Sequence, residues 1–83
     1  MSLPRQLHVR FFAVLREQAG CSALEIETGA RTPAELYTEL QKSHPLTFPA
    51  TLLRVSLNER YADMTAPLSA GDRVVFIPPV AGG

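Results

Sequence analysis

Residues 71–83 read GDRVVFIPPVAGG, and this closing stretch decides how the chain folds. A Gly-Asp turn leads into residues 73–77, an apolar, β-branched run that is typical of a central strand buried on both faces. Pro78 and Pro79 end that strand because proline has no N–H to donate to a sheet ladder. We therefore expect a folded domain over residues 1–77, followed by an extended tail over residues 78–83.

Two further strands are expected near the start of the chain. In residues 7–12, Leu7, Val9 and Phe11 alternate with a second set of side chains, His8, Arg10 and Phe12. Residues 22–28 alternate in the same way, and a period of two is typical of a half-buried strand. Between them, residues 13–19 carry apolar side chains at helical spacing and precede Gly20, so they predict a short helix. The side chains expected on the buried faces of these two strands are Leu7, Val9, Phe11, Leu24 and Ile26.

A capping box, Thr-Pro-Ala-Glu at residues 32–35, predicts the start of the main helix. The Thr32 hydroxyl is expected to accept from the Glu35 amide, and the Glu35 carboxylate to accept from the Thr32 amide. Pro33 suits the first helical position, where its missing N–H would have no partner. The helix should end near Ser43, because the next residue precedes a proline. The stripe that it is expected to bury is Leu36, Tyr37 and Leu40.

The remaining elements complete an α+β domain. Residues 53–57 predict a third long strand, and the turn over residues 58–60 leads to a short return strand at Tyr61. Four or five strands over one main helix form a two-layer α+β arrangement. We expect the first and last strands to lie side by side in the middle of the sheet.

Composition excludes several classes of function. The chain has 83 residues, and its eight basic and eight acidic side chains cancel, so no basic excess indicates nucleic acid or an anionic membrane as a partner. Its single cysteine cannot form an internal disulfide or a cysteine-rich zinc site. The apolar runs are far shorter than the ~20 residues of a membrane span, and residues 1–10 lack the apolar segment of a signal peptide. We expect a cytoplasmic protein.

Side-chain patterns typical of enzymes are missing. The chain has no Gly-rich phosphate loop, so ATP chemistry is not expected of it. His8 and His44 are far apart in the sequence and are interpreted as surface residues. Cys21 has no cationic neighbour in the sequence to lower its thiol pKa and is interpreted as a turn residue. The acidic pairs are expected to be solvated, and no metal or stably bound cofactor is predicted; these pairs are Glu25 with Glu27 and Glu35 with Glu39.

The tail, Pro-Pro-Val-Ala-Gly-Gly, has no polar side chain, and its chemistry rests on its last carboxylate. The prolines stiffen its exit from the domain by fixing φ, and Gly82 and Gly83 have no Cβ to block passage through a narrow channel. A carboxylate is a poor electrophile, so Gly83 would need activation, for example as an acyl adenylate made by an ATP-binding partner. It would then accept sulfur or an amine. The alternative is a frayed end without function, which the apolar composition opposes.

The ending resembles a known family of sulfur carriers. Residues 68–83, together with Phe-Phe-Ala-Val-Leu-Arg-Glu at residues 11–17 and Gly20, are similar to the small subunits of molybdopterin synthase. The resemblance runs from about Leu7 to Gly83. Its Gly-Asp turn and double glycine are shared with other ubiquitin-like sulfur carriers, whereas the Pro-Pro-Val-x-Gly-Gly ending is more specific.

The resemblance implies a β-grasp fold, with a mixed four- to five-stranded sheet on one helix, and a carrier that catalyses nothing alone. Gly83, preceded by Gly82, would be adenylated by a ubiquitin-activating-like enzyme using ATP. A sulfur donor protein would supply the sulfur that turns Gly83 into a thiocarboxylate. The tail would enter the large synthase subunit in a heterotetramer and donate sulfur to cyclic pyranopterin monophosphate. Two such deliveries would build the dithiolene of molybdopterin.

The resemblance also implies which residues touch the partners. The large subunit would supply the cationic residues that the tail lacks. An exposed apolar patch is expected around Phe76 and the tail, because such patches mark partner sites. The residues expected to pack against partners are Phe76, Pro78, Pro79, Val80 and Ala81.

Three rival interpretations stay open. A sulfur carrier of the thiamine pathway would use the same tail chemistry, although the Pro78-Pro79 pair argues against it. A protein modifier would form isopeptide bonds; Lys42 is the chain's only lysine, so polymers are not expected, but single attachment is open. A plain binding module would keep its activity after deletion of Gly82 and Gly83.

Overall fold

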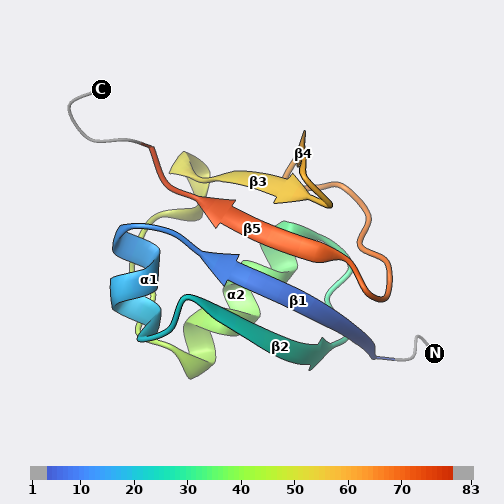
Figure 1. Ribbon diagram of the computed structural model, residues 1–83, viewed down its shortest axis with the longest axis horizontal. Helices are drawn as coiled ribbons and strands as arrows, with labels where there is room; N and C mark the ends of the chain where they lie inside the picture. The colour runs from blue at the N-terminus through green and yellow to red at the C-terminus, as the bar shows by residue number, and fades with distance from the viewer. Residues whose placement is uncertain (1–3, 80–83) are drawn as a thin grey trace.

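Residues 4–79 are described by a computed structural model, and they form one sheet with helices on one side (Figure 1). The last four residues of the chain, and the site predictions that fall on them, lie outside the described part. The elements in chain order are β1 (Arg5–Phe11), α1 (Val14–Ala19), β2 (Ala23–Thr28), α2 (Pro33–Ser43), the 3₁₀ helix η1 (Ala50–Leu52), β3 (Arg54–Leu57), β4 (Arg60–Ala62) and β5 (Arg73–Ile77).

The sheet has five strands in the order β2-β1-β5-β3-β4. As expected, the first and last strands are neighbours in the middle, and they run parallel. The other pairs, β1 with β2, β3 with β5 and β3 with β4, are antiparallel. Figure 1 shows α2 crossing behind the sheet. The predicted α+β arrangement of a mixed sheet on one main helix is therefore confirmed.

Strand β5 is buried on one face only, so the prediction of burial on both faces was wrong. Val74 and Phe76 are buried, whereas Arg73 is exposed and Val75 and Ile77 are half-buried. The reason is the two-layer architecture: the main helix covers one face of the sheet, and within residues 4–79 no helix covers the other. We call that second face the open face.

Phe76 belongs to the core, and the prediction that it lies in an exposed patch was wrong. Its side chain is 0% exposed and stacks on Phe11, with ring centroids 6.5 Å apart. The ring of Tyr37 on α2 lies 5.3 Å from it on the helix side. Strand register explains this burial, because Phe76 is paired with Phe11 and Val55, whose side chains are both buried under α2. Phe76 is therefore removed from the residues expected to touch a partner.

Helix α2 begins at the predicted cap, with one difference. The Thr32 hydroxyl accepts from the Glu35 amide at 3.2 Å, and Pro33 occupies the first turn. The Glu35 carboxylate, however, accepts from the amide of Arg31 at 2.9 Å instead of from that of Thr32. With Thr32 in an extended conformation, the preceding amide is the one that the carboxylate reaches. The helix ends at Ser43 as predicted, and it buries the expected Leu36, Tyr37 and Leu40.

The β3–β4 turn is tied to the loop before β5 through Asp72. The Asp72 carboxylate accepts from the Asn58 side-chain amide at 2.9 Å and from the Ser69 backbone amide at 2.7 Å. Asn58 also accepts from the Arg73 backbone amide at 2.9 Å. Asn58 and Glu59 both have positive φ, at 52° and 74°, a conformation that costs free energy for residues other than glycine. These bonds offset that cost and fix how β5 enters the sheet.

Among residues 4–79, no helix is long and apolar enough to cross a membrane.

Candidate functional site

The root of the tail, at the end of β5, is the part of the predicted site that the structure describes. Pro78 is buried and Pro79 is exposed. Since a proline fixes φ, the pair leaves the sheet in a restricted direction. The other predicted site residues of the tail lie outside the described part; these are Val80, Ala81, Gly82 and Gly83.

Three large apolar side chains surround this root. Phe12, Leu52 and Tyr61 are exposed by 47%, 57% and 74%. Phe12 lines a groove of about 450 Å³ that ends on Pro79. Leu52 and Tyr61 line a second groove of about 510 Å³, which also ends on Pro79. We call Phe12, Leu52, Tyr61, Ile77 and Pro79 the collar, because these side chains lie on both sides of the point where the tail leaves the domain.

The first groove is held by bonds from both helices. The Tyr37 hydroxyl on α2 donates to the Phe48 carbonyl at 2.8 Å. The Gln18 side chain on α1 accepts from the backbone amides of Thr47 and Phe48 at 3.0 and 3.3 Å. Burial raises the pKa of the Tyr37 phenol above its usual 10.0. Phe48, which lines the groove beside Phe12, is thus positioned by the domain itself.

Phe12 reaches the groove through a strained turn. Its neighbour Ala13 precedes α1 with φ 52° and ψ −127°, a conformation that residues with a Cβ rarely adopt. Phe12 follows directly on β1, and Phe11 is paired with Phe76, so Phe12 lies beside Ile77 at the same edge of the groove. Strain of this kind persists where the surrounding structure over-determines the backbone, and it is frequent at binding sites.

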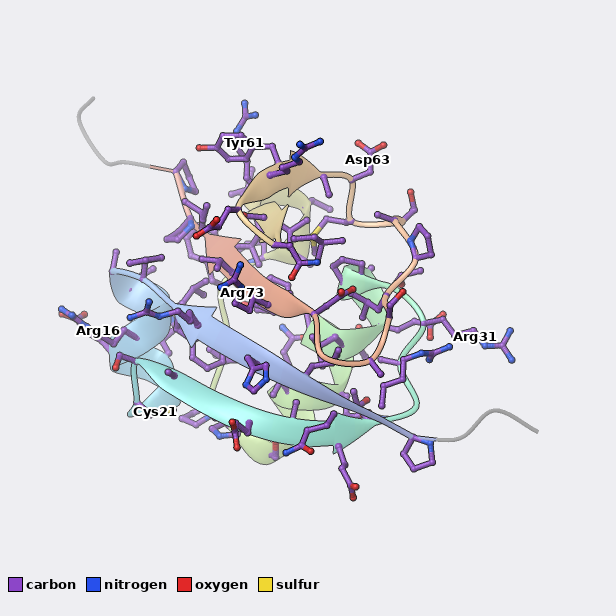
Figure 2. All side chains as sticks on the ribbon, turned by 45° about the vertical axis from the view of Figure 1, so that its right-hand side comes forward. Arg16, Cys21, Arg31, Tyr61, Asp63 and Arg73 are labelled. Carbon is purple, nitrogen blue, oxygen red and sulfur yellow. The ribbon has the colours of Figure 1, made fainter. Side chains whose placement is uncertain are left out.

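The second groove combines apolar with charged side chains. Leu52 comes from η1 and Tyr61 from β4, and Arg54 and Asp63 also line the groove. Figure 2 shows Tyr61 and Asp63 on the same side of the molecule, both directed into solvent. Alternation explains the placement of Tyr61: it is paired with Ser56 of β3, on the open face, whereas its neighbour Ala62 is paired with the buried Val55.

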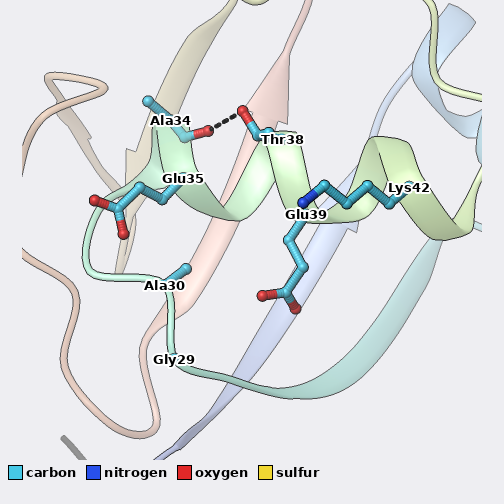
Figure 3. Close-up of a pocket in the computed structure, with 7 residues that line it drawn as sticks. All are labelled: Gly29, Ala30, Ala34, Glu35, Thr38, Glu39 and Lys42. Carbon is cyan, nitrogen blue, oxygen red and sulfur yellow. Dashed lines mark hydrogen bonds between the residues drawn. The ribbon is translucent and has the colours of Figure 1, made fainter. Parts of the chain in front are cut away.

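The acidic pairs and histidines take part in local contacts of the domain. Glu39 accepts from the Thr28 hydroxyl at 2.6 Å, and together with Glu35 and Lys42 it lines a shallow hollow beside α2 (Figure 3). His8 pairs with Glu25 at 3.0 Å on the open face. His44 contacts the Ser43 hydroxyl at 2.9 Å. Cys21 is a half-buried free thiol just before β2.

Among residues 4–79, no group of three or more His, Cys, Asp or Glu side chains is placed to hold a metal ion. The only polar side-chain group of the collar is the Tyr61 hydroxyl. The apolar surface of the collar is suited to binding, because exposed apolar side chains gathered in one place mark partner sites. The described part of the site therefore offers a docking surface.

Sequence reasoning missed most of the collar. Phe12, Leu52 and Tyr61 were not among the predicted partner-binding residues. One signal was present: Phe12 occupies a polar position in the alternation of residues 7–12, next to the buried Phe11. Leu52 and Tyr61 gave no such signal, because η1 and β4 are too short to show a period.

Comparison with known proteins indicates one family. The sequence profile of the ThiS family matches residues 9–83. The molybdopterin synthase sulfur carrier subunit of Haemophilus influenzae is 32% identical over 80 residues, which cover 93% of this chain and 99% of that protein.

Solved structures agree with this. SAMP1 of Haloferax volcanii has a TM-score of 0.77 and 26% identity, and the match covers 94% of this chain and 99% of that one. In a protein–protein complex of subunits 1 and 2 of the molybdopterin-converting factor from Helicobacter pylori, one chain has a TM-score of 0.66 and 30% identity, with coverage of 94% and 99%. The ubiquitin-like β-grasp fold and the resemblance drawn from residues 11–17 and 68–83 are thereby confirmed.

Proposed function

Because the chain belongs to the ThiS family, we propose that it is the sulfur-carrying small subunit of a molybdopterin synthase. The observation that carries the proposal is the collar, an apolar docking surface built around the root of a tail that leads to Gly82 and Gly83. The relative from Haemophilus influenzae, whose name states this function, supports it. So does the Helicobacter pylori complex, in which a similar chain is bound to a second subunit.

The chemistry that follows from this function takes place at the Gly83 carboxylate. A ubiquitin-activating-like partner would join it to the α-phosphate of ATP with loss of pyrophosphate. Sulfide-level sulfur from a donor protein would then displace AMP and leave a thiocarboxylate; where the donor holds the sulfur as a persulfide, a thiol reductant would supply the two electrons that release it. In the large subunit, the thiocarboxylate sulfur would attack cyclic pyranopterin monophosphate, and water would then cleave the acyl–sulfur bond and return Gly83 as a carboxylate. Two such deliveries would supply both sulfurs of the dithiolene. In this scheme the activating enzyme binds ATP and the large subunit binds the pterin, and the chain holds neither of them as a cofactor.

The domain contributes the placement of the tail. Pro78 is buried against the domain, so the tail starts from a fixed point, and a stiff start loses little conformational entropy on docking. A partner that covers Phe12 on one side and Tyr61 on the other necessarily straddles Pro79. Aromatic side chains of this kind commonly carry more than ~1 kcal/mol each at interfaces. The collar thus supplies affinity, and the tail supplies the reacting group.

A second candidate function is favoured by one observation. The structure of SAMP1 has a higher TM-score, 0.77, than the chain in the Helicobacter pylori complex, 0.66, although its sequence identity is lower. Another structure from the same archaeon is named small archaeal modifier protein 1. An activated Gly83 that met a lysine amine instead of sulfur would form an isopeptide bond. The two functions share the activation step and differ in the acceptor.

Reconstituted sulfur transfer tests the proposal. The chain, loaded with sulfur by its activating enzyme, is mixed with the large subunit and the pterin precursor, and the dithiolene product is measured. We expect one dithiolene product for every two loaded chains, and none from a variant that lacks Gly82 and Gly83. Product formed equally well by the truncated variant would refute the proposal. Isopeptide conjugates without any dithiolene product would favour the modifier.

A further inference from the structure

Three arginines lie together on the open face of the sheet, beside the collar. Arg10 of β1 is paired with Val75 of β5, and Arg54 of β3 is paired with Ile77. Arg73 lies on β5 two residues before Val75, and is therefore on the same face. All three arginines are exposed, while the two apolar side chains between them are half-buried. We call these five residues the arginine face; Figure 2 shows Arg73 over the sheet, on the side away from α2.

Two acidic side chains border this face: Glu59 lines a hollow with Arg10 and Arg73, and Asp63 lines the second groove with Arg54. All eight acidic side chains fall within the described residues, and none lies on the open face of β1, β5 or β3. Glu59, in the turn, approaches Arg73 at 3.9 Å, but both side chains are exposed, and such pairs contribute little. The nearest acid on β2, Glu25, is engaged by His8. The chain has no net charge, so this local excess of positive charge comes from the fold and not from the composition.

We propose that the arginine face docks an acidic, carboxylate-bearing surface of the protein that receives the tail. This inference rests on the proposed function, since it concerns the same partner. Continuity with the collar supports it: Ile77 belongs to both surfaces, and Arg54 lines the second groove together with Tyr61. A partner that covers the collar therefore also meets the arginines. Its surface should carry carboxylates around an apolar centre, to match Val75 and Ile77.

The extent of the face favours a protein over a polyanion. The three central strands span only about 10 Å at ~4.8 Å per neighbour. Beyond β1 the open face carries Glu25 and Glu27, and beyond Arg73 it meets Glu59. A phosphate backbone lying across the arginines would run onto these carboxylates, whereas a compact acidic patch on a protein would not.

Charge at the rim of an interface acts mainly on the rate of association and on the choice of partner. Opposite charges attract the two proteins before contact, and salt screens the attraction. Guanidinium groups also bind carboxylates through two parallel hydrogen bonds, so the geometry of docking becomes more specific. The association rate and its dependence on salt are therefore the quantities to measure.

The first test compares two variants with the same change of charge. Arg10→Glu/Arg73→Glu reverses the arginine face, and Arg31→Glu/Lys42→Glu reverses two exposed charges, one just before α2 and one in its last turn. With the full chain and the large synthase subunit from the same genome, we expect the first variant to associate at least about tenfold more slowly at low salt. The control should stay within about twofold of the parent chain. Equal rates for the two variants, or a deficit that high salt does not reduce, would overturn the inference.

The second test locates the carboxylate. In an Arg73→Lys variant, carbodiimide should join the new amine to an Asp or Glu of the large subunit, and mass spectrometry should identify the bridged peptides. Arg31→Lys is the matched control and should give no such link. Tight binding of the Arg73→Lys variant without any link would contradict the inference. Binding of total tRNA by the parent chain, if the Arg10→Glu/Arg73→Glu variant loses it, would also contradict the inference, because the face would then bind a polyanion.

The two proposals fail separately. If the chain transfers sulfur but its association is insensitive to these charges, the arginine face is refuted and the sulfur-carrier function stands. If association depends on the arginines but no sulfur is ever transferred, the carrier function fails and the acidic partner surface stands.

Discussion

Replacing Phe76 and Tyr61 in turn separates the core from the docking surface. Phe76 is 0% exposed between Phe11 and Tyr37, whereas Tyr61 is 74% exposed in the collar. A buried Phe→Ala change costs about 3–5 kcal/mol. A domain of 83 residues has about 4–12 kcal/mol of stability in total. Phe76→Ala should therefore leave a large fraction of the chain unfolded or close to unfolding, while Tyr61→Ala should change the free energy of unfolding by no more than about 0.5 kcal/mol.

Affinity for the large subunit should depend on Tyr61 and not on Phe76, the reverse of their effects on stability. Tyr61→Ala removes an aromatic side chain at a predicted interface, for which a loss of about 1–2 kcal/mol, or roughly five- to thirtyfold in Kd, is typical. Phe76→Leu keeps the core position apolar and should bind the large subunit like the parent chain. Urea unfolding followed by circular dichroism gives the stability, and titration calorimetry gives Kd. A Phe76→Leu variant that is stable but binds at least tenfold more weakly would refute this assignment, and so would a Tyr61→Ala variant that unfolds.

Three further predictions concern the strain, the turn and the buried phenol. Ala13→Gly should relieve about 1–3 kcal/mol of backbone strain at φ 52°, at a cost of about 0.5–1 kcal/mol for the more flexible unfolded chain. With a net gain of about 1 kcal/mol, we expect a Tm higher by about 4–8 °C in calorimetry; a lower Tm would show that the strain is smaller than this entropy cost. Asp72→Ala removes two hydrogen bonds to a charged acceptor and should cost about 2–4 kcal/mol in urea unfolding; a loss below 0.5 kcal/mol, measured the same way, would contradict the role of Asp72 in the turn. Burial raises the pKa of the Tyr37 phenol. The stability that the buried, protonated phenol contributes is therefore complete below pH 10.0 and is lost as pH rises through the folded-state pKa. Tyr37→Phe should abolish this alkaline loss of stability and Tyr61→Phe should not; the same pH dependence of unfolding in both variants would contradict the prediction.

Local patterns in the sequence predicted the elements well, because each depends on neighbours in the chain. The alternation of Leu7, Val9 and Phe11 with polar residues identifies both β1 and its buried face. The Thr-Pro-Ala-Glu box locates the start of α2 to the residue, since a cap acts within one turn. The αL residue Gly20 ends α1 with φ 78°, as predicted.

The face of β5 could not be predicted in the same way. Residues 74–77 are all apolar, so the sequence contains no alternation that says which side chains point toward α2. The pairing with β1 decides it: Phe76 is paired with the buried Phe11, and Ile77 therefore lies on the open face. Register depends on residues more than sixty positions apart, and a shift by one would exchange the two faces. This is why Phe76 was wrongly placed in the docking surface and Ile77 was overlooked.

The collar is also a product of long-range structure. Phe12, Leu52, Tyr61 and Pro79 come from four separate segments, and the fold brings them together. Each alone is a single exposed apolar residue, which is common on protein surfaces. The function was nonetheless predictable from the sequence, because the tail that the collar surrounds is continuous and distinctive in composition.

The intact mass of the protein isolated from its own cells tests whether Gly83 carries sulfur. We expect a species that ends at Gly83 and carries one sulfur in place of one oxygen, with the exchange localised by fragmentation to that last residue. The same species should disappear when the activating enzyme is deleted. A mature chain that continues beyond Gly83, or one that ends there and never carries sulfur under conditions in which molybdopterin is being made, would contradict the account.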